Sequence, residues 1–115
     1  MILFLQHKWF DMIADGEKFE EYRAATPWMR ARVRTFERLP EDKRIIEFRR
    51  GYTNTKLRVW CRCFTLGRYA YVGNIHGLHL MNYYLKTTWG FDFEALNLGK
   101  SNGFFYVFSF GRVMG

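Results

Sequence analysis

The feature that most constrains the fold of this chain is a regular alternation of apolar and charged residues over residues 56–65. One set of alternate positions is apolar: Leu57, Val59, Cys61 and Cys63. The other set is basic apart from one tryptophan: Lys56, Arg58, Trp60 and Arg62. Successive side chains of a β-strand point to opposite faces of a sheet. The pattern therefore predicts a strand with one buried and one solvated face, as is typical of antiparallel sheets.

Other strand signals are shorter. Runs rich in strand-forming residues predict further strands at residues 2–6, 19–24, 44–49 and 104–113. A glycine turn is expected at residues 66–68, followed by another candidate strand at residues 69–72. Several short strands with glycine-containing turns favour a small curved or closed sheet.

Helix signals lie between the strands. Apolar residues at positions 9, 10, 12 and 13 fit one face of a short helix, and Gly16 is expected to end it. Thr26 and Pro27 open a second helix over residues 29–38. Residues 78–86 fit a helix or a strand, and residues 92–98 fit about one and a half helical turns. The predicted fold class is α+β, with residues 1–115 forming a single domain.

The composition excludes a disordered chain and points to an anionic partner. Hydrophobic residues make up 49% of the 115 residues, and aromatic residues make up 20%. The formal charge is +7, from 18 Lys and Arg against 11 Asp and Glu. Such an excess favours nucleic acid as a partner, with simple solubility as the alternative. No run approaches the ~18 apolar residues of a membrane span, and the start lacks a signal peptide's pattern. We expect a soluble cytoplasmic protein with no membrane association.

Cysteine and histidine usage gives no sign of a metal site. Cys61 and Cys63 fall on the same face of the predicted strand, and we expect two reduced, half-buried thiols. Two cysteines and three scattered histidines do not form a metal-binding pattern. No metal and no cofactor is expected.

The charged stretch DGEKFEEYR at residues 15–23 has two interpretations. In a regular strand Glu21 and Arg23 share one face and Lys18 lies on the other. Lys18 reaches the same side only if it leaves the turn after Gly16, from where its long stem spans the gap. The three residues then form either an exposed cluster at a sheet edge or one shielded pocket with shifted pKa values. The residues alone favour the exposed cluster.

Residues 16–23 fit the pattern G-x-K-x-x-E-x-R and resemble the signature of the ASCH domain family, within the PUA-like superfamily. Three later segments are similar to other parts of that family: IEFRRGY at 46–52, TWG at 88–90 and FFYVFSFGRV at 104–113. The resemblance implies a small PUA-like β-barrel of five to six mostly antiparallel strands with two to three short helices packed outside. It also implies a cleft beside the first motif that binds RNA or a modified nucleoside.

The resemblance reverses the preference for the charged stretch. It places Lys18, Glu21 and Arg23 in one pocket, where an ionised Glu21 orients the two cations toward acceptor atoms of a ligand.

Further basic and aromatic residues are candidate ligand contacts. Arg30, Arg34 and Arg38 align on a helix, whereas Arg30, Arg32 and Arg34 would align on a strand. Trp28 and Tyr52 are candidate platforms for base stacking. The full predicted binding set is Lys18, Glu21, Arg23, Trp28, Arg30, Arg34, Arg50 and Tyr52. The alternatives are a solvated charged face for the arginines and a core position for Trp28.

Three functions remain open from the sequence. The first is binding of RNA, another single-stranded nucleic acid or a nucleoside-like small molecule. The second, implied by the same superfamily, is an amidohydrolase acting on acylated cytidine or a ribonuclease, with Lys18, Glu21 and Arg23 as catalytic residues. That branch carries threonine where this chain has Glu21, which is expected to raise the pKa of Lys18, and Glu94 matches its further glutamate by order alone. The third is a protein-interaction module of phage or mobile-element type.

Overall fold

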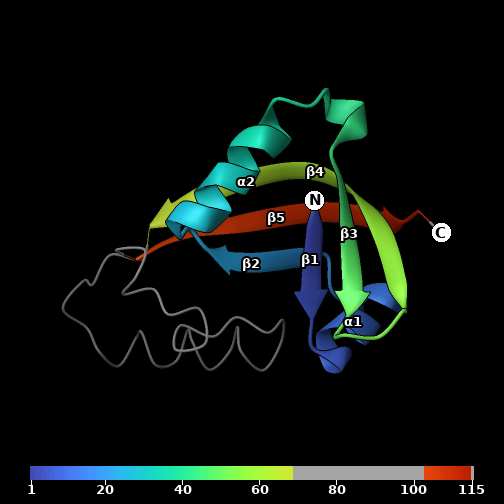
Figure 1. Cartoon of the computed structure of the whole chain (residues 1–115). Coiled ribbons are helices and arrows are strands. Elements are labelled where there is room, and N and C mark those ends of the chain that lie inside the picture. The colour runs from blue at the N-terminus through green and yellow to red at the C-terminus, as the bar shows by residue number, and fades with distance from the viewer. Residues whose placement is uncertain (69–102, 115) are drawn as a thin grey trace.

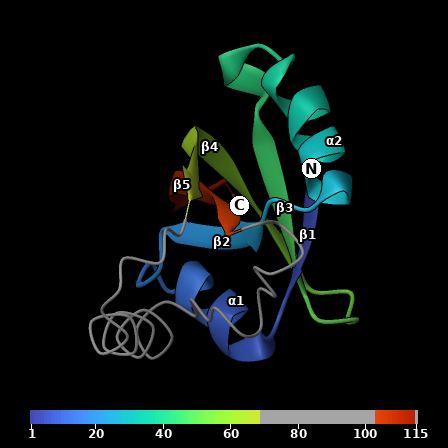
Figure 2. The ribbon, with the colours of Figure 1, turned by 90° about the vertical axis from the view of Figure 1, so that its left-hand side faces the viewer.

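The structure is a computed structural model, and it describes residues 1–68 and 103–114 (Figure 1). Its strands are β1 (Ile2–Leu5), β2 (Glu20–Ala24), β3 (Ile45–Arg50), β4 (Lys56–Arg68) and β5 (Phe104–Val113). They form one sheet in the order β1-β3-β4-β5-β2. β1 pairs with β3 in parallel, and the other pairs are antiparallel. The long strands β4 and β5 curve, so the sheet curls into a half-barrel (Figures 1 and 2). The predicted fold class is confirmed.

Helices cover different parts of this sheet (Figure 2). The described residues form helix α1 (His7–Ala14), helix α2 (Pro27–Glu37) and a 3-10 turn, η1 (Glu41–Lys43). Helix α2 begins where the Thr-Pro signal predicts, because Thr26 Oγ1 accepts from the Met29 N–H at 3.2 Å and Pro27 occupies the first turn. No helix in the described part of the chain has the length and apolar character needed to cross a membrane.

The core lies between the helices and the sheet. Helix α1 buries Phe10 and Ile13, and helix α2 buries Met29, Val33 and Phe36. The strands contribute alternate residues, among them Ile46, Phe48, Val59 and Phe108, each of which is fully buried. This alternation is the pattern that predicted the sheet.

The alternation of β4 breaks after Cys61, which corrects the expectation for Cys63. Cys61 pairs with Phe110 and Cys63 with Ser109, so β4 carries one extra residue there. Cys63 is therefore exposed rather than half-buried, whereas burial raises the pKa of the Cys61 thiol to about 11.

The predicted turn at residues 66–68 is also wrong, because β4 continues to Arg68, which pairs with Phe104. The elements expected at residues 69–72, 78–86 and 92–98, together with the TWG segment and Glu94, lie outside the described residues.

Gly16 ends helix α1, as predicted. Its φ of 80° lies in the left-handed region. The Gly16 N–H donates to the Ile13 carbonyl at 3.1 Å, and the Glu17 N–H donates to the Met12 carbonyl at 2.9 Å. These two bonds form a Schellman motif, which satisfies carbonyls at the end of the helix. The Lys18 N–H also donates to the Met12 carbonyl, at 3.1 Å, so Lys18 leaves directly from this turn.

We expect Gly16→Ala to lower the free energy of unfolding by about 1–2 kcal/mol, because an L-residue at this φ is strained. A Cβ at Gly16 would meet no atom within 4 Å, so the loss would come from backbone conformation rather than from a clash. Urea denaturation followed by circular dichroism measures the change. Gly111→Ala is the control, because its Cβ would make an ordinary 3.5 Å contact with Arg62. Equal stability of the two variants would contradict the prediction.

Candidate functional site

The two edge strands of the half-barrel, β1 and β2, leave an open seam between them. Along β1 the carbonyls of Met1 and Leu5 accept from N–H groups of the β3 side, at 2.8 and 2.7 Å. Carbonyls alternate in direction along a strand, so those of Ile2 and Phe4 point away from β3 and into the seam. An unsatisfied sheet edge is costly when buried and invites wrong pairing when exposed.

Two arginines cap these seam carbonyls. Arg32 on helix α2 donates from Nη2 to the Ile2 carbonyl at 2.7 Å. Arg23 on β2 donates from Nη2 to the Phe4 carbonyl at 2.8 Å. The second bond joins β2 to β1 across the seam. Both edge strands are thus connected by a charged side chain rather than by a backbone ladder.

The β2 side of the seam is capped in the same way. Phe19 and Ala25 bond to the backbone of the β5 side, at 3.0 and 2.9 Å, so the backbone groups of Glu20 and Tyr22 point toward the seam. The Lys18 ammonium donates to the Glu20 carbonyl. The Tyr22 N–H donates to Glu21 Oε1 at 3.0 Å.

Glu21 links the two cations of the seam. Its Oε1 lies 3.5 Å from the Lys18 Nζ, and its Oε2 lies 3.0 Å from the Arg23 Nη2. The side chain of Lys18 is 0% exposed and that of Glu21 is 8% exposed, whereas that of Arg23 is 26% exposed. The Lys18 ammonium also lies 5.2 Å from the centroid of the Tyr22 ring.

The three motif residues therefore converge, and Lys18 arrives from the turn after Gly16, as predicted. The alternative of an exposed cluster is wrong, because Lys18 and Glu21 are buried. The geometry differs from the expectation in one respect. The Lys18 ammonium is directed at acceptors of the protein itself, the Glu20 carbonyl and the Glu21 carboxylate, rather than at an open pocket.

Burial governs the electrostatics of this group. Desolvation lowers the pKa of Lys18, the Glu21 carboxylate opposes this shift, and Arg23 adds to it. The net direction is opposite to the expected rise, because the loss of hydration of the buried Lys18 ammonium outweighs its attraction to the Glu21 carboxylate. The pKa of Tyr22 is raised by burial and by the hydrogen bond from its hydroxyl to Glu20 Oε2, 2.8 Å long.

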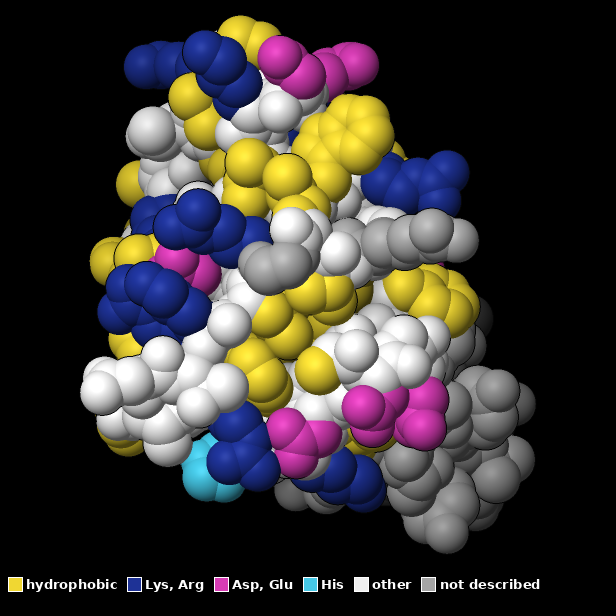
Figure 3. Space-filling model, turned by 90° about the vertical axis from the view of Figure 1, so that its right-hand side faces the viewer, with side chains coloured by type: hydrophobic (Ala, Val, Ile, Leu, Met, Phe, Trp, Pro, Cys, Tyr) yellow, Lys and Arg dark blue, Asp and Glu magenta, His cyan; other side chains and the backbone are white. Residues whose placement is uncertain are grey.

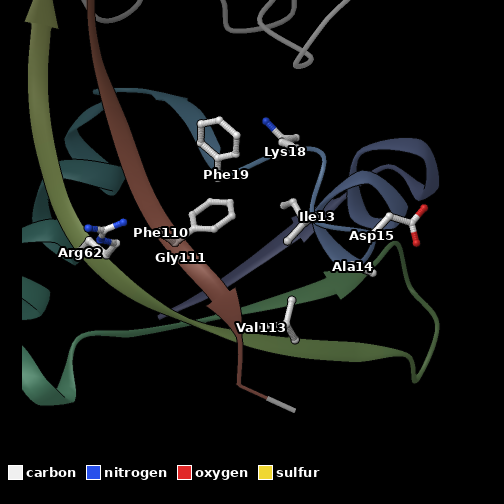
Figure 4. A pocket seen from close by; sticks show the side chains of 10 residues that line it. Ile13, Ala14, Asp15, Lys18, Phe19, Arg62, Phe110, Gly111 and Val113 are labelled. Atoms are coloured by element: carbon white, nitrogen blue, oxygen red, sulfur yellow. The ribbon is translucent and has the colours of Figure 1, made fainter.

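A hollow of about 440 Å³ opens beside the Gly16 turn (Figure 4). Its walls are mostly apolar and include Ile13, Phe19, Phe110 and Val113, with Asp15, Lys18 and Arg62 as its charged residues. Figure 4 shows the rings of Phe19 and Phe110 between Arg62 and Ile13. Phe19 is 48% exposed, whereas Phe110 belongs to the core. The hollow thus joins aromatic surface to an exposed guanidinium group.

The other predicted contacts fall into two groups: arginines that are bonded within the fold, and residues that are exposed at the surface. Arg30 donates to the Ala25 carbonyl at 3.0 Å, and Arg50 makes two hydrogen bonds to the Asp11 carboxylate, at 2.9 and 3.1 Å. Both therefore hold parts of the fold together. Arg34 is exposed on helix α2.

Trp28 and Tyr52 both lie on the surface. Trp28 is 64% exposed, so the alternative of a core position is wrong, and the Arg32 guanidinium lies 4.5 Å from its ring centroid. Tyr52 is 98% exposed.

Two residues at these surfaces, Phe19 and Phe4, were missed by sequence reasoning. Phe19 was assigned to a strand, yet it lines the hollow together with Arg62, which belongs to the basic face of the predicted strand at residues 56–65. Phe4 is 47% exposed between the buried Leu3 and Leu5, and this alternation within the first apolar run was the available signal. Within the described residues no group of three or more His, Cys, Asp and Glu side chains is placed to hold a metal ion.

No family model and no curated protein matches this chain. Solved structures do match it, among them two crystal structures of ZmASCH from Zymomonas mobilis, a serine-to-alanine and a tyrosine-to-phenylalanine mutant. In each case the sequence identity is 12% and the TM-score is 0.53. The matches cover 97% of this chain and 68% and 70% of the two ZmASCH chains. At this identity the likeness concerns the fold alone, which this chain shares with the two ASCH structures.

Proposed function

We propose that this chain binds RNA or another single-stranded nucleic acid and that an unpaired base or a nucleoside enters the hollow beside Gly16. The observation that carries this proposal is the hollow itself. Its volume of about 440 Å³ falls within the range of about 300–1,000 Å³ that is usual for small-ligand sites. Its position beside the Gly16 turn is where the ASCH resemblance implies a cleft.

The lining of the hollow suits a base with an attached phosphate. The half-exposed ring of Phe19 offers a face for stacking. The exposed Arg62 offers a guanidinium group, which pairs well with phosphate. Asp15 supplies acceptors for the amino group of a base or for a ribose hydroxyl. The formal charge of +7 supports association with a polyanion.

The charged motif contributes by holding the seam closed. Lys18, Glu21 and Arg23 bond to one another and to backbone groups of both edge strands. In this proposal the motif shapes the wall of the hollow, and the ligand contacts come from Phe19 and Arg62.

A hydrolase is a second candidate, favoured by the environment of Lys18. A lysine that acts as a base or nucleophile needs a lowered pKa, and burial lowers the pKa of Lys18 next to a carboxylate and a tyrosine. The substrate would be an acylated cytidine, with Lys18, Glu21 and Arg23 as the catalytic residues. In the related amidohydrolases threonine occupies the position of Glu21.

Incubation with an acylated cytidine, followed by chromatography for free cytidine, tests the hydrolase. Cytidine release by the natural chain that is lost in Lys18→Arg would support it, because arginine keeps the charge but cannot act as a base near neutral pH. A gain of cytidine release in Glu21→Thr would also support it. If neither the natural chain nor Glu21→Thr releases cytidine, the hydrolase is ruled out.

For the binding proposal, we expect Phe19→Ala to weaken binding of a short single-stranded RNA by about 5-fold to 150-fold. The reason is that one base–aromatic stack contributes about 1–3 kcal/mol. Arg62→Gln should lower the slope of log affinity against log salt by about 0.7, the value for one phosphate contact to a single strand. Fluorescence anisotropy with a labelled oligonucleotide measures both effects.

The matched control for Arg62 is Arg38→Gln. Arg38 is an exposed arginine at the end of helix α2, outside the lining of the hollow. A loss of affinity in Arg38→Gln equal to that in Arg62→Gln would show that general charge, and not the hollow, drives binding.

We expect Glu21→Gln to lower the free energy of unfolding by about 1.5–3 kcal/mol, the range for hydrogen bonds that involve charged groups. The substitution leaves the buried Lys18 without its counter-charge. Chemical denaturation measures the loss. Glu47→Gln is the control, because Glu47 also pairs with two cations, Arg49 and Arg58, but their side chains are 37% and 59% exposed. An unchanged free energy of unfolding in Glu21→Gln would show that Glu21 does not stabilise the seam.

A further inference from the structure

Tyr52 is displayed at the tip of the hairpin that joins β3 to β4, and its turn is well ordered by hydrogen bonds. The Arg50 carbonyl accepts from the Thr53 N–H at 3.2 Å and from the Thr53 hydroxyl at 2.6 Å. The Arg50 N–H donates to the Thr55 carbonyl at 2.9 Å, and the Thr55 N–H donates to Thr53 Oγ1 at 3.2 Å. A ring that is 98% exposed is therefore held on a defined backbone.

The same turn is anchored to the body of the protein. Arg50 pairs with Asp11 of helix α1 through two hydrogen bonds. The Gly51 N–H donates to the Leu5 carbonyl at 2.7 Å, and Gly51 has a φ of 57°. A Cβ at Gly51 would lie 3.1 Å from His7 Nε2, so a glycine allows this close approach. These contacts fix the position of Tyr52 relative to β1.

A second exposed aromatic ring lies beside Tyr52. The ring centroids of Phe4 and Tyr52 are 5.6 Å apart, and the ring planes are tilted by 36°. Phe4 is 47% exposed, because its neighbours in β1 occupy the core side of the sheet. The Arg49 guanidinium lies 5.7 Å from the Phe4 centroid. We name Phe4, Tyr52 and Arg49 the outer platform.

The surroundings of the outer platform are mainly basic. Lys56 pairs with Arg49 in the β3–β4 register, and Arg58 pairs with Glu47 in the same register. Glu47 is the acidic residue among them and is shared by Arg49 and Arg58, at 3.0 and 3.4 Å. Figure 3 shows basic side chains at several places around the face it views, with acidic side chains beside some of them. Three cations against one carboxylate leave this surface positive.

We infer that the outer platform is a second contact site, at which an unpaired base of a single-stranded nucleic acid stacks while Lys56 and Arg58 contact phosphates. The inference rests on the proposed function for the class of partner, but it concerns a different surface from the hollow. Single-stranded nucleic acid is the partner that uses both features, because aromatic rings stack on bases and cations contact phosphates. An acidic protein would need the cations alone, and a duplex hides the faces of its bases.

The test compares variants of the full chain by fluorescence anisotropy with a short labelled oligouridylate. We expect Tyr52→Ala to weaken binding about 5-fold or more, from the loss of one base stack, and Tyr52→Phe to bind like the natural chain because it keeps the ring. Trp60→Ala is the matched control, since Trp60 is also an exposed ring and lies on β4 outside the outer platform. Trp60→Ala should leave the affinity unchanged. Tyr52 is a surface residue on a turn, so the circular dichroism spectrum of each variant should match that of the natural chain.

The outcomes separate this inference from the proposed function. If Phe19→Ala weakens binding and Tyr52→Ala does not, the inference that the outer platform binds is wrong, and the proposal that the hollow binds is supported. If Tyr52→Ala weakens binding and Phe19→Ala does not, binding at the outer platform is supported, and the proposal that the hollow binds is wrong. If the natural chain does not bind the oligouridylate, both fail. If polyglutamate displaces the oligouridylate and binds Tyr52→Ala as well as the natural chain, the surface is a site for an acidic protein, and the inference is wrong.

Discussion

The open seam between β1 and β2 is the constraint around which this half-barrel is arranged. Backbone groups at the two edges need partners, and charged side chains supply them where the structure describes a bond. Arg23 reaches across to the Phe4 carbonyl, and Lys18 binds the Glu20 carbonyl. Burying the Lys18 charge is costly, and the Glu21 carboxylate offsets that cost while it also holds Arg23. Closure of the seam therefore depends on one acidic side chain that is shared by two cations.

Because several basic side chains have partners inside the fold, the basic composition does not by itself indicate contacts with a ligand. Several arginines donate to backbone carbonyls within the chain: Arg23, Arg30, Arg32 and Arg44. Arg50 is paired with Asp11. These groups contribute to the net charge, and so to long-range attraction of a polyanion, but their hydrogen-bonding capacity is partly used inside the fold. Under the proposed function, direct contacts to phosphate would come from exposed cations such as Arg34, Lys56, Arg58 and Arg62.

Sequence reasoning succeeded where local rules decide the outcome and failed where distant partners do. The left-handed Gly16, the Thr26 cap and the strand alternation up to Cys61 follow from neighbouring residues. The exposure of Cys63 and the extension of β4 to Arg68 depend on the register with β5, more than 35 residues away along the chain. Whether Lys18 would be buried could not be decided from the sequence for the same reason. Strand parity showed how Lys18 could reach Glu21, but only the seam determines that its ammonium is enclosed.

The Gly16 turn connects closure of the fold to the proposed binding site. It ends helix α1 beside the hollow, where Asp15 and Gly16 form part of the lining. It also directs Lys18 toward the Glu20 carbonyl and Glu21 at the seam. The residues of the G-x-K-x-x-E-x-R pattern therefore have a structural role that requires no contact with a ligand. Under the proposed function, this pattern would shape the cleft, whereas the side chains that line it, such as Phe19 and Arg62, would recognise the ligand. Two proteins with the same pattern can for this reason share a fold and a cleft and still bind different molecules.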